Sequence, residues 1–221
     1  MSMQDTDGIR ASRLLLEIGA VHIRPTQPFT YTSGRVGPVY VDCRKVISFP
    51  RARRALIAMM AAQVEREIGL ESLDAVAGGE TAGIPYAAWL SDALSLPMLY
   101  VRKKPKGFGR NAQIEGEFAP GARVLLVEDL SNDGGSKITF AEALRAADAV
   151  TTDCMVVFSY EAPGARDAMA KAGLRLHALA DWTSVLSTAI ASGRINKADA
   201  DAVHAFLADP AGWSVAHGGK D

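Results

Sequence analysis

Residues 124–137 read Val-Leu-Leu-Val-Glu-Asp-Leu-Ser-Asn-Asp-Gly-Gly-Ser-Lys, and this stretch decides the fold. Its apolar beginning predicts a buried strand that delivers two adjacent carboxylates, Glu128 and Asp129, to its carboxyl end. A short polar loop with two glycines follows and turns into a helix, expected over Ser136–Ala147. Ligands bind at this edge of an open α/β sheet. The stretch therefore predicts both a strand–loop–helix unit and a ligand site.

Strand-like and helix-like segments alternate outward from this unit. Strands are expected at Leu73–Ala77, Met98–Val101, Arg123–Glu128, Thr151–Phe158 and Leu174–Leu179. Further helices are expected at Ile9–Ile18, Arg51–Ile68, Ile84–Ala93, Gly164–Ala172, Asp181–Ala191 and Lys197–Leu207. Residues 21–41 should form short strands and turns, and residues 216–221 should be loose. The alternation is typical of stacked βαβ units, so the expected fold class is α/β, with a mostly parallel central sheet flanked by helices.

The composition narrows the classes of function. The chain has 221 residues, 48% of them hydrophobic, which favours a single domain over residues 1–221. Its 24 basic and 25 acidic residues nearly cancel, which argues against a general nucleic-acid or acidic-membrane binder. The polar, acidic start does not resemble a signal peptide, and no apolar run approaches the length of a membrane span. Cys43 and Cys154 are too few and too far apart for a disulfide framework or a zinc site, so a cytoplasmic protein is expected.

The glycines after the strand suit an anion. Gly134 and Gly135 let backbone N–H groups approach a phosphate, and Ser136 is placed to cap the helix or to donate its hydroxyl. Glu128 and Asp129 suit sugar hydroxyls or a magnesium ion. A phosphorylated sugar fits these groups together. An ordinary βα turn with solvated acids remains the alternative, whereas a Walker-type loop is excluded because its G-x-x-x-x-G-K-[ST] motif does not occur.

A second segment, residues 102–110, carries five cations and no acid. It reads Arg-Lys-Lys-Pro-Lys-Gly-Phe-Gly-Arg and follows an expected strand, and its proline and two glycines predict a mobile loop. Concentrated positive charge on such a loop would neutralise a departing pyrophosphate and exclude water on closure. The alternatives are a solvated charge run and a nucleic-acid patch, and the latter is weakened because Phe108 is the only aromatic residue in the segment.

These two segments resemble the phosphoribosyltransferases and, taken together, the orotate phosphoribosyltransferases. Residues 124–137 are similar to the family's signature for phosphoribosyl pyrophosphate (PRPP): an apolar strand, two acids and a glycine-containing turn. The loop resembles the family's Arg-Lys-x-x-Lys loop through Arg102, Lys103, Lys106 and Gly109, with Glu115–Gly116 after it. Residues 29–42 resemble the family's base-recognition segment, and residues 77–85 resemble its pyrophosphate loop.

The resemblance implies a type I phosphoribosyltransferase-like fold with a small hood formed by residues about 1–45. It implies transfer of the phosphoribosyl group from PRPP to orotate, giving orotidine 5′-monophosphate and pyrophosphate in pyrimidine biosynthesis. It implies Mg²⁺, held through the substrate's pyrophosphate and ribose hydroxyls, with Glu128 and Asp129 as further candidate ligands. It also implies a homodimer in which loop 102–110 completes the partner's site, with no nucleic-acid or membrane partner.

The resemblance assigns residues to each part of the site. The implied catalytic residues are Arg102, Lys103 and Lys106. The implied PRPP contacts are these three together with Glu128, Asp129, Ser131, Asn132, Asp133, Gly134, Gly135 and Ser136. The implied orotate contacts are Asn132, Tyr160, Arg35, Tyr40 and Val41.

The sequence departs from the family's pattern mainly where the base would bind. The departures are Thr32 and Ala82 for two lysines, Tyr160 for an arginine, Phe108 for a histidine, and Asn132 and Asp133 for the usual loop residues. A desolvated orotate carboxylate needs a cation or an N–H group, and Arg35 and the backbone amides of residues 39–41 are both candidates. Two other functions stay open: transfer to another base, and a regulator of the same fold that senses PRPP or binds RNA.

Overall fold

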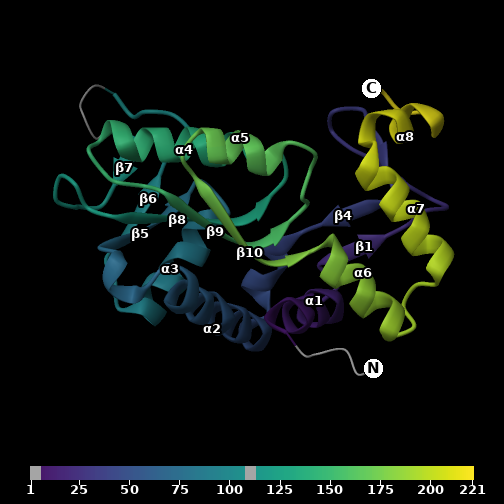
Figure 1. Cartoon of the computed structure of the whole chain (residues 1–221), viewed down its shortest axis with the longest axis horizontal. Coiled ribbons are helices and arrows are strands. Elements are labelled where there is room, and N and C mark those ends of the chain that lie inside the picture. The colour runs from purple at the N-terminus through teal and green to yellow at the C-terminus, as the bar shows by residue number, and fades with distance from the viewer. Residues whose placement is uncertain (1–5, 108–112) are drawn as a thin grey trace.

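The structure, a computed structural model, describes residues 6–107 and 113–221. Its centre is a six-stranded sheet in the order β10-β9-β8-β5-β6-β7 (Figure 1). The strands are β5 (Ala75–Gly79), β6 (Met98–Val101), β7 (Ile114–Glu115), β8 (Val124–Ser131), β9 (Asp153–Ser159) and β10 (Arg175–Asp181). Each neighbouring pair is parallel except β6 with β7. The expected α/β fold with a mostly parallel sheet is confirmed, and the five expected strands occur within a few residues of their expected bounds.

Helices cover both faces of this sheet (Figure 1). On one face lie α4 (Gly135–Ala146) and α5 (Ala165–Lys171); on the other lie α2 (Pro50–Glu67) and α3 (Gly83–Leu94). Two further helices, α1 (Asp7–Glu17) and α6 (Trp182–Ala191), pack against each other near β10. Alternate residues of β8 face opposite sides, so Leu125 packs into one hydrophobic core and Leu126 into the other. The sheet is therefore buried on both faces, and polar side chains that could contact a ligand are expected at its edges and strand ends.

The strand order creates a crevice at the expected place. From β5 the chain moves outward to β6, then returns across β5 to β8 and continues in the opposite direction to β9 and β10. Ligands of open α/β sheets bind outside the carboxyl ends of the strands at which the order reverses in this way, here β5 and β8. Glu128 and Asp129 lie near that end of β8, which continues to Ser131, three residues beyond its expected end.

The hood draws on two distant parts of the chain. Two small antiparallel sheets, β1 (Val21–Ile23) with β4 (Val39–Val41) and β2 (Phe29–Thr30) with β3 (Val36–Gly37), bear out the short strands expected over residues 21–41. Beside them lie α7 (Lys197–Ala208) and α8 (Pro210–Ala216) (Figure 1). The first helix, α1, packs instead against β10 and α6. The walls of the hood therefore include two helices that the sequence did not assign to it.

The expectation that residues 216–221 are loose is wrong. The Gly219 N–H donates to the Ser214 carbonyl oxygen at 2.8 Å, and the Lys220 N–H donates to the Gly34 carbonyl oxygen at 3.0 Å. The preceding helix, α8, was not expected either. It begins at Pro210, and the Asp209 side chain caps it by accepting the Gly212 N–H.

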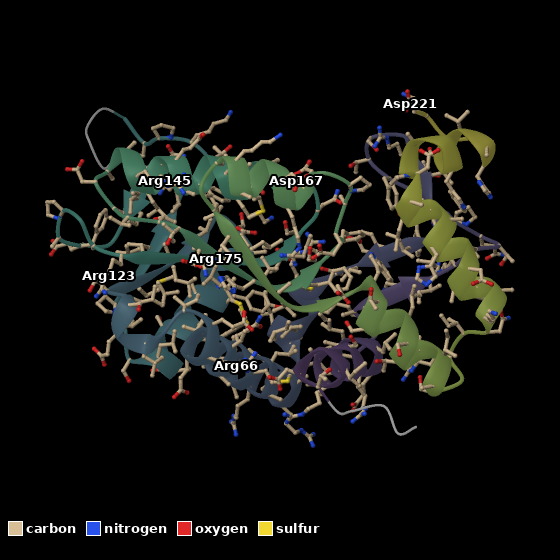
Figure 2. The ribbon with its side chains drawn as sticks, viewed as in Figure 1. Arg66, Arg123, Arg145, Asp167, Arg175 and Asp221 are labelled. Carbon is tan, nitrogen blue, oxygen red and sulfur yellow. The ribbon has the colours of Figure 1, made fainter. Side chains whose placement is uncertain are left out.

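The amino-terminal edge of the sheet, opposite the crevice, is tied together by arginines (Figure 2). Arg123 lies 2.7 Å from Asp74, which joins the starts of β8 and β5. Arg145 donates from the end of α4 to the Thr151 and Ala172 carbonyl oxygens, which precede β9 and β10. These arginines stabilise the fold through those contacts, and they lie away from the crevice.

Two remaining features concern the chain as a whole. Cys43 and Cys154 are both buried and free, which agrees with their interpretation as small apolar side chains. Among the residues that the structure describes, no helix has the length and apolar character that a membrane crossing requires.

Candidate functional site

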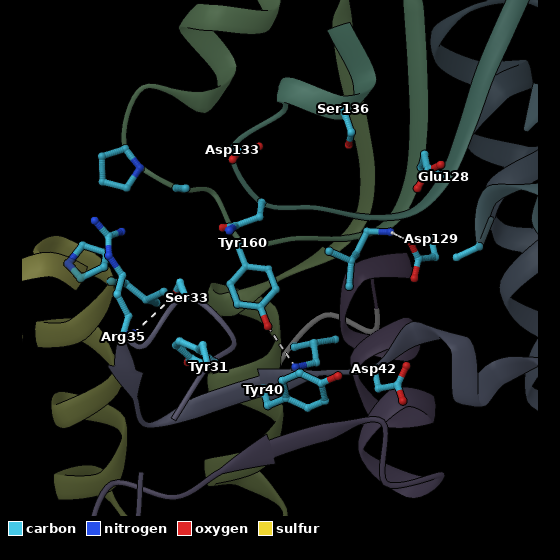
Figure 3. Close-up of a pocket in the computed structure, with 18 of the residues that line it drawn as sticks. Tyr31, Ser33, Arg35, Tyr40, Asp42, Glu128, Asp129, Asp133, Ser136 and Tyr160 are labelled. Carbon is cyan, nitrogen blue, oxygen red and sulfur yellow. Dashed lines mark hydrogen bonds between the residues drawn. The ribbon is translucent and has the colours of Figure 1, made fainter. Parts of the chain in front are cut away.

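A cavity of about 1330 Å³ lies between the carboxyl edge of the sheet and the hood. One wall is the end of β8 with the loop into α4, and the facing wall is the hood with the corner between α7 and α8 (Figure 3). Of the site residues expected from the sequence, those that line the cavity are Arg35, Tyr40, Val41, Lys103, Glu128, Asp129, Asn132, Asp133, Ser136 and Tyr160. The structure thus brings together residues from four separated segments of the sequence.

Two nearly buried carboxylates form the inner end of the cavity. Glu128 and Asp129 keep only 6% and 8% of their surface exposed. Burial raises the pKa of Glu128 to about 8; the nearby Lys137 opposes the rise and Asp129 adds to it. Burial likewise raises the pKa of Asp129. The Asp129 carboxylate accepts the Leu130 N–H at 2.8 Å, whereas Glu128 Oε1 has no hydrogen-bond partner among the described residues.

Glycines make room for the Glu128 carboxylate. A Cβ on Gly79, at the end of β5, would collide with Glu128 Oε1, and one on Gly83 would lie 2.9 Å from the same atom. Both belong to the glycine-rich segment 77–85, of which Glu80, Thr81 and Ala82 line the cavity. Small residues are therefore required here because the neighbouring strand presents a carboxylate.

A buried lysine lies behind these acids. Lys137 Nζ is 3.8 Å from Glu128 Oε2, and the side chain is 8% exposed. It also donates to the Ser136 hydroxyl at 3.2 Å. Lys137 therefore places one buried cation beside two buried acids, and Lys103 and Arg44 add positive charge at the cavity wall.

The loop after β8 carries the expected anion-binding features, with one complication. Gly134 has φ +81°, and a Cβ there would lie 2.7 Å from Met169 Cγ, so glycine is required on both counts. The loop leads directly into the start of α4, while Ser131 is fully buried at the strand end and does not line the cavity. The Gly135 N–H is already taken, because it donates to Asp133 Oδ1 at 2.9 Å. A carboxylate thus accepts one of the amide donors expected for a phosphate.

The basic loop is anchored at its base by two acids. Arg102 lies 3.0 Å from Glu115, the acid of the expected Glu-Gly pair. The Lys103 N–H donates to Glu80 Oε2 at 2.8 Å, and Lys103 lines the cavity of its own protomer. Lys106 is exposed and does not line this cavity. The expected loop members Phe108, Gly109 and Arg110 lie outside the described residues.

Aromatic side chains join the sheet to the hood at the other end of the cavity. The Tyr160 hydroxyl, just after β9, accepts the Val41 N–H at 3.0 Å, and burial raises the pKa of Tyr160 (Figure 3). The Tyr31 hydroxyl donates to the Val39 carbonyl oxygen at 2.5 Å, and burial raises the pKa of Tyr31 to about 12. The Val41 amide is therefore already used, which leaves Arg35 as the stronger of the two expected partners for a carboxylate.

Several cavity residues were not expected from the sequence. Arg44 lines the cavity and is held by Asp42 at 2.8 Å and by the Tyr40 hydroxyl at 3.2 Å. Asp209 and Pro210, at the corner between α7 and α8, line the facing wall. Arg44 follows the base-recognition segment by two residues, and its proximity to that segment could have drawn attention to it. No sequence pattern placed the α7–α8 corner near the cavity.

The donor set limits how a metal could be held. Among the described residues no group of three or more His, Cys, Asp or Glu side chains could hold an ion. Glu128 and Asp129 supply hard carboxylate oxygens of the kind that Mg²⁺ prefers, but too few to complete six-coordination. A magnesium ion at this edge would need most of its ligands from a bound phosphorylated substrate and from water.

Known proteins resemble the chain in sequence and in structure. A relative from Jannaschia sp. (strain CCS1) named orotate phosphoribosyltransferase is 50% identical over 203 residues, which are 91% of this chain and 89% of the relative. The solved orotate phosphoribosyltransferase of Aeropyrum pernix is 30% identical, with a TM-score of 0.69, covering 84% of this chain and 99% of that one. The solved UMP synthase of Leishmania donovani is 28% identical, with a TM-score of 0.76, covering 91% of this chain and 42% of that one. No family model matches the chain.

Proposed function

The chain belongs to the family of orotate phosphoribosyltransferases, and from this premise we propose how its cavity holds the two substrates. The enzyme transfers the phosphoribosyl group of PRPP to orotate in pyrimidine biosynthesis. The bond between the anomeric carbon and pyrophosphate breaks with its electron pair leaving on pyrophosphate. A ring nitrogen of orotate bonds to that carbon and loses its proton to pyrophosphate or to water. Positive charge builds on the ribose ring meanwhile, so catalysis depends on positioning and electrostatics.

The ribose of PRPP is assigned to Glu128 and Asp129. The observation that supports this assignment most strongly is Glu128 Oε1, a buried acceptor at the cavity wall with no partner among the described residues. A buried carboxylate without donors is costly, and ribose hydroxyls are donors of the required kind. Ligand binding would then favour the ionised form of Glu128 and lower its pKa.

Mg²⁺ is assigned to the same edge. When bound, it would neutralise charge on the pyrophosphate group. Glu128 and Asp129 would contribute oxygens to the coordination of the ion and would orient the ribose hydroxyls next to it. Among the described residues no three His, Cys, Asp or Glu side chains are grouped so as to hold an ion, which supports an ion that enters together with PRPP.

The 5′-phosphate is assigned to the loop from Ser131 to Ser136 and the amino-terminal end of α4. Support comes from the strand–loop–helix geometry, in which backbone N–H groups and the positive end of a helix dipole face an anion. Asn132 and Ser136 line the cavity and offer side-chain donors. Asp133 must release the Gly135 N–H before a phosphate can use it.

Orotate is assigned to the hood side of the cavity. Tyr40 and Tyr160 supply flat apolar surface for the ring, Val41 forms part of the wall, and Asn132 can donate to a ring oxygen. Arg35 is the proposed partner of the carboxylate. A panel of bases tests this assignment: use of uracil or adenine in place of orotate would contradict it.

The basic loop is assigned to pyrophosphate, and the enzyme is proposed to be a homodimer. Lys103 supports a role within its own protomer, because it lines that cavity. Lys106 does not line it, which supports the proposal that the outer part of loop 102–110 acts in the partner's site. The proposed setting is the cytoplasm, and residues 1–221 are proposed to form one domain.

Mixing inactive variants tests the shared site. In random mixtures of Lys106→Ala with the double variant Glu128→Gln/Asp129→Asn, half of the dimers contain one copy of each. If Lys106 acts in the partner's site, each mixed dimer has one intact site, and about a quarter of wild-type activity returns. Mixing with Lys103→Ala instead should restore no activity if Lys103 acts within its own protomer. No recovery in either mixture would contradict a shared site.

One assay tests the whole proposal: orotate consumption followed by ultraviolet absorbance with PRPP and Mg²⁺ present. Calorimetry of PRPP binding with Mg²⁺ then tests the ribose assignment. The Glu128→Gln/Asp129→Asn variant should bind roughly 10- to 100-fold more weakly, because two charge-assisted contacts are lost. Binding of PRPP or of RNA without turnover would favour the regulator instead.

A further inference from the structure

We propose that Ser214 and residues 217–221, here called the clasp, hold the β2–β3 hairpin of residues 29–37 in the position that binds orotate. Ser214 is thus a positioning residue: it touches no substrate and acts through the hairpin. The inference rests on the proposed function, because orotate is the ligand on which its main effect is measured.

Ser214 is the centre of the clasp. It lies on α8 and is fully buried. Its hydroxyl accepts the Val36 N–H of β3 at 2.9 Å and donates to the Lys220 carbonyl oxygen at 2.5 Å. One hydroxyl therefore joins three segments: the hairpin, α8 and the residues after α8.

The residues after α8 complete the contact with the hairpin. The Lys220 N–H donates to the Gly34 carbonyl oxygen at 3.0 Å. A Cβ on Gly219 would lie 2.5 Å from Ser214 Oγ and 2.7 Å from the Val36 nitrogen, so the backbone approaches too closely for any larger residue. Asp221 lies 4.0 Å from Arg35, but both side chains are well exposed and this pair adds little (Figure 2).

The hairpin needs support from outside. Its two strands share only two residue pairs, and a two-stranded ribbon of that length is at best marginally stable alone. Within its turn, the Tyr31 N–H donates to the Arg35 carbonyl oxygen and the Gly34 N–H donates to that of Tyr31. The same turn presents Tyr31, Ser33 and Arg35 to the cavity (Figure 3). Loosening of the clasp would therefore displace Arg35, the group assigned to the orotate carboxylate, and leave the groups assigned to PRPP in place.

Steady-state kinetics of Ser214→Ala test the proposal. We expect the KM for orotate to rise about three- to tenfold, the change that loss of one hydrogen bond typically produces, with kcat and the KM for PRPP within about twofold. Ser192→Ala is the matched control, since its hydroxyl also bonds carbonyl oxygens of a helix end but touches no part of the hairpin. A role confined to stability would lower the active fraction and leave both KM values unchanged, which would overturn the proposal.

Hydrogen exchange provides a readout that needs no ligand. Exchange of the backbone amides of residues 33–37 should become at least fivefold faster in Ser214→Ala and in a variant without residues 218–221, but not in Ser192→Ala. Lys220→Ala should keep most of the protection, because the hydrogen bond is made by the backbone and only the packing of the lysine side chain beside Gly34 is lost. Unchanged exchange in the first two variants would overturn the clasp. If the wild type did not use orotate, the proposed function would fail, and the exchange result would still decide whether the clasp holds the hairpin.

Discussion

The two halves of the cavity are built differently. The half assigned to phosphoribose comes largely from one continuous strand, loop and helix, residues 124–146, with Lys103 beside it. The half assigned to the base comes from the hairpin and β4, from Tyr160, and from the corner between α7 and α8. In the first half, a local sequence fixes which groups meet. In the second half, groups meet only because segments more than a hundred residues apart pack together, as in the bond between Val41 and Tyr160.

This difference separates the groups assigned to the reacting phosphoribose from the groups assigned to the choice of base. The two carboxylates assigned to the ribose lie on the rigid sheet edge, where burial raises their pKa values, and Lys103 of the basic loop lies beside them. The groups assigned to the base are joined by single hydrogen bonds between short elements, such as that between Val41 and Tyr160. Changes in the first half should therefore alter turnover, PRPP binding and pH dependence, whereas changes in the second should alter mainly the KM for orotate.

The largest effect is expected from Lys103→Ala. Turnover should fall roughly 100-fold, since the lysine stabilises charge that develops on the leaving pyrophosphate, while the KM values change only a few-fold. Steady-state kinetics measure both, and Lys104→Ala, on an exposed neighbour outside the cavity lining, serves as control. An equal loss in both variants would show that general loop charge matters and would weaken the assignment of Lys103.

The next effect concerns pH and stability. In the unfolded chain Glu128 should titrate near 4.5, whereas burial raises its pKa to about 8 in the folded protein. Between these values the folded protein holds a proton that the unfolded chain has lost, so the free energy of unfolding falls as the pH rises through this window. Glu128→Gln cannot titrate, so this decrease in the free energy of unfolding should be absent in the variant.

Urea unfolding without ligand measures this difference. Relative to wild type, Glu128→Gln should gain roughly 1–3 kcal/mol on going from pH 5 to pH 9. Glu142→Gln is the control, because it removes a carboxylate that is exposed on the outer face of α4. Gln113→Glu would not serve, because it adds a charge. Parallel pH profiles for wild type and Glu128→Gln would contradict the raised pKa.

A smaller effect is expected from Asp133→Ala. Its carboxylate accepts the Gly135 N–H and repels a phosphate, so its removal should tighten PRPP binding about three- to tenfold. The same change should lower stability by about 0.5–1 kcal/mol because a loop hydrogen bond is lost. Calorimetry and urea unfolding give the two values. Asp199→Ala breaks the capping box of α7 and should lower stability without affecting PRPP.

The smallest effect is expected from Tyr160→Phe. Loss of the bond to the Val41 N–H should raise the KM for orotate about two- to fivefold and leave the KM for PRPP unchanged. Tyr100→Phe, on β6 and outside the cavity lining, is the matched control. A shift in the KM for PRPP would show that the two halves are coupled, contrary to the comparison above.

The sequence predicted the parts of the molecule that depend on neighbouring residues. The strand before Glu128 and the loop glycines are local, because burial and φ are decided over a few residues. The expectation that Ser136 could cap the helix is wrong, because α4 begins at Gly135 and its N-cap is Gly134. The alternation of strands and helices then fixed a parallel sheet and its ligand-binding edge.

The remaining parts depend on packing at a distance. Nothing near Asp209 indicates that it lines the same cavity as Tyr160, and nothing near residues 217–221 indicates a partner in the turn at Gly34. The contact between Asp133 and Gly135 was also missed, although it is local, because an acid beside an anion site is recognised only once its side chain is seen to turn back on the loop.

The bond between Val36 and Ser214 spans 178 residues, and its neighbour joins Gly34 to Lys220. Because a chain emerges from the ribosome in order, the wall that selects the base is complete only after residues 214–220 have been synthesised. The groups that hold PRPP have been synthesised some 80 residues earlier by the same residue numbering. Because β9 and β10 lie beside β8 in the sheet and a domain folds as a unit, the phosphate-binding edge and the wall for the base reach their native packing together.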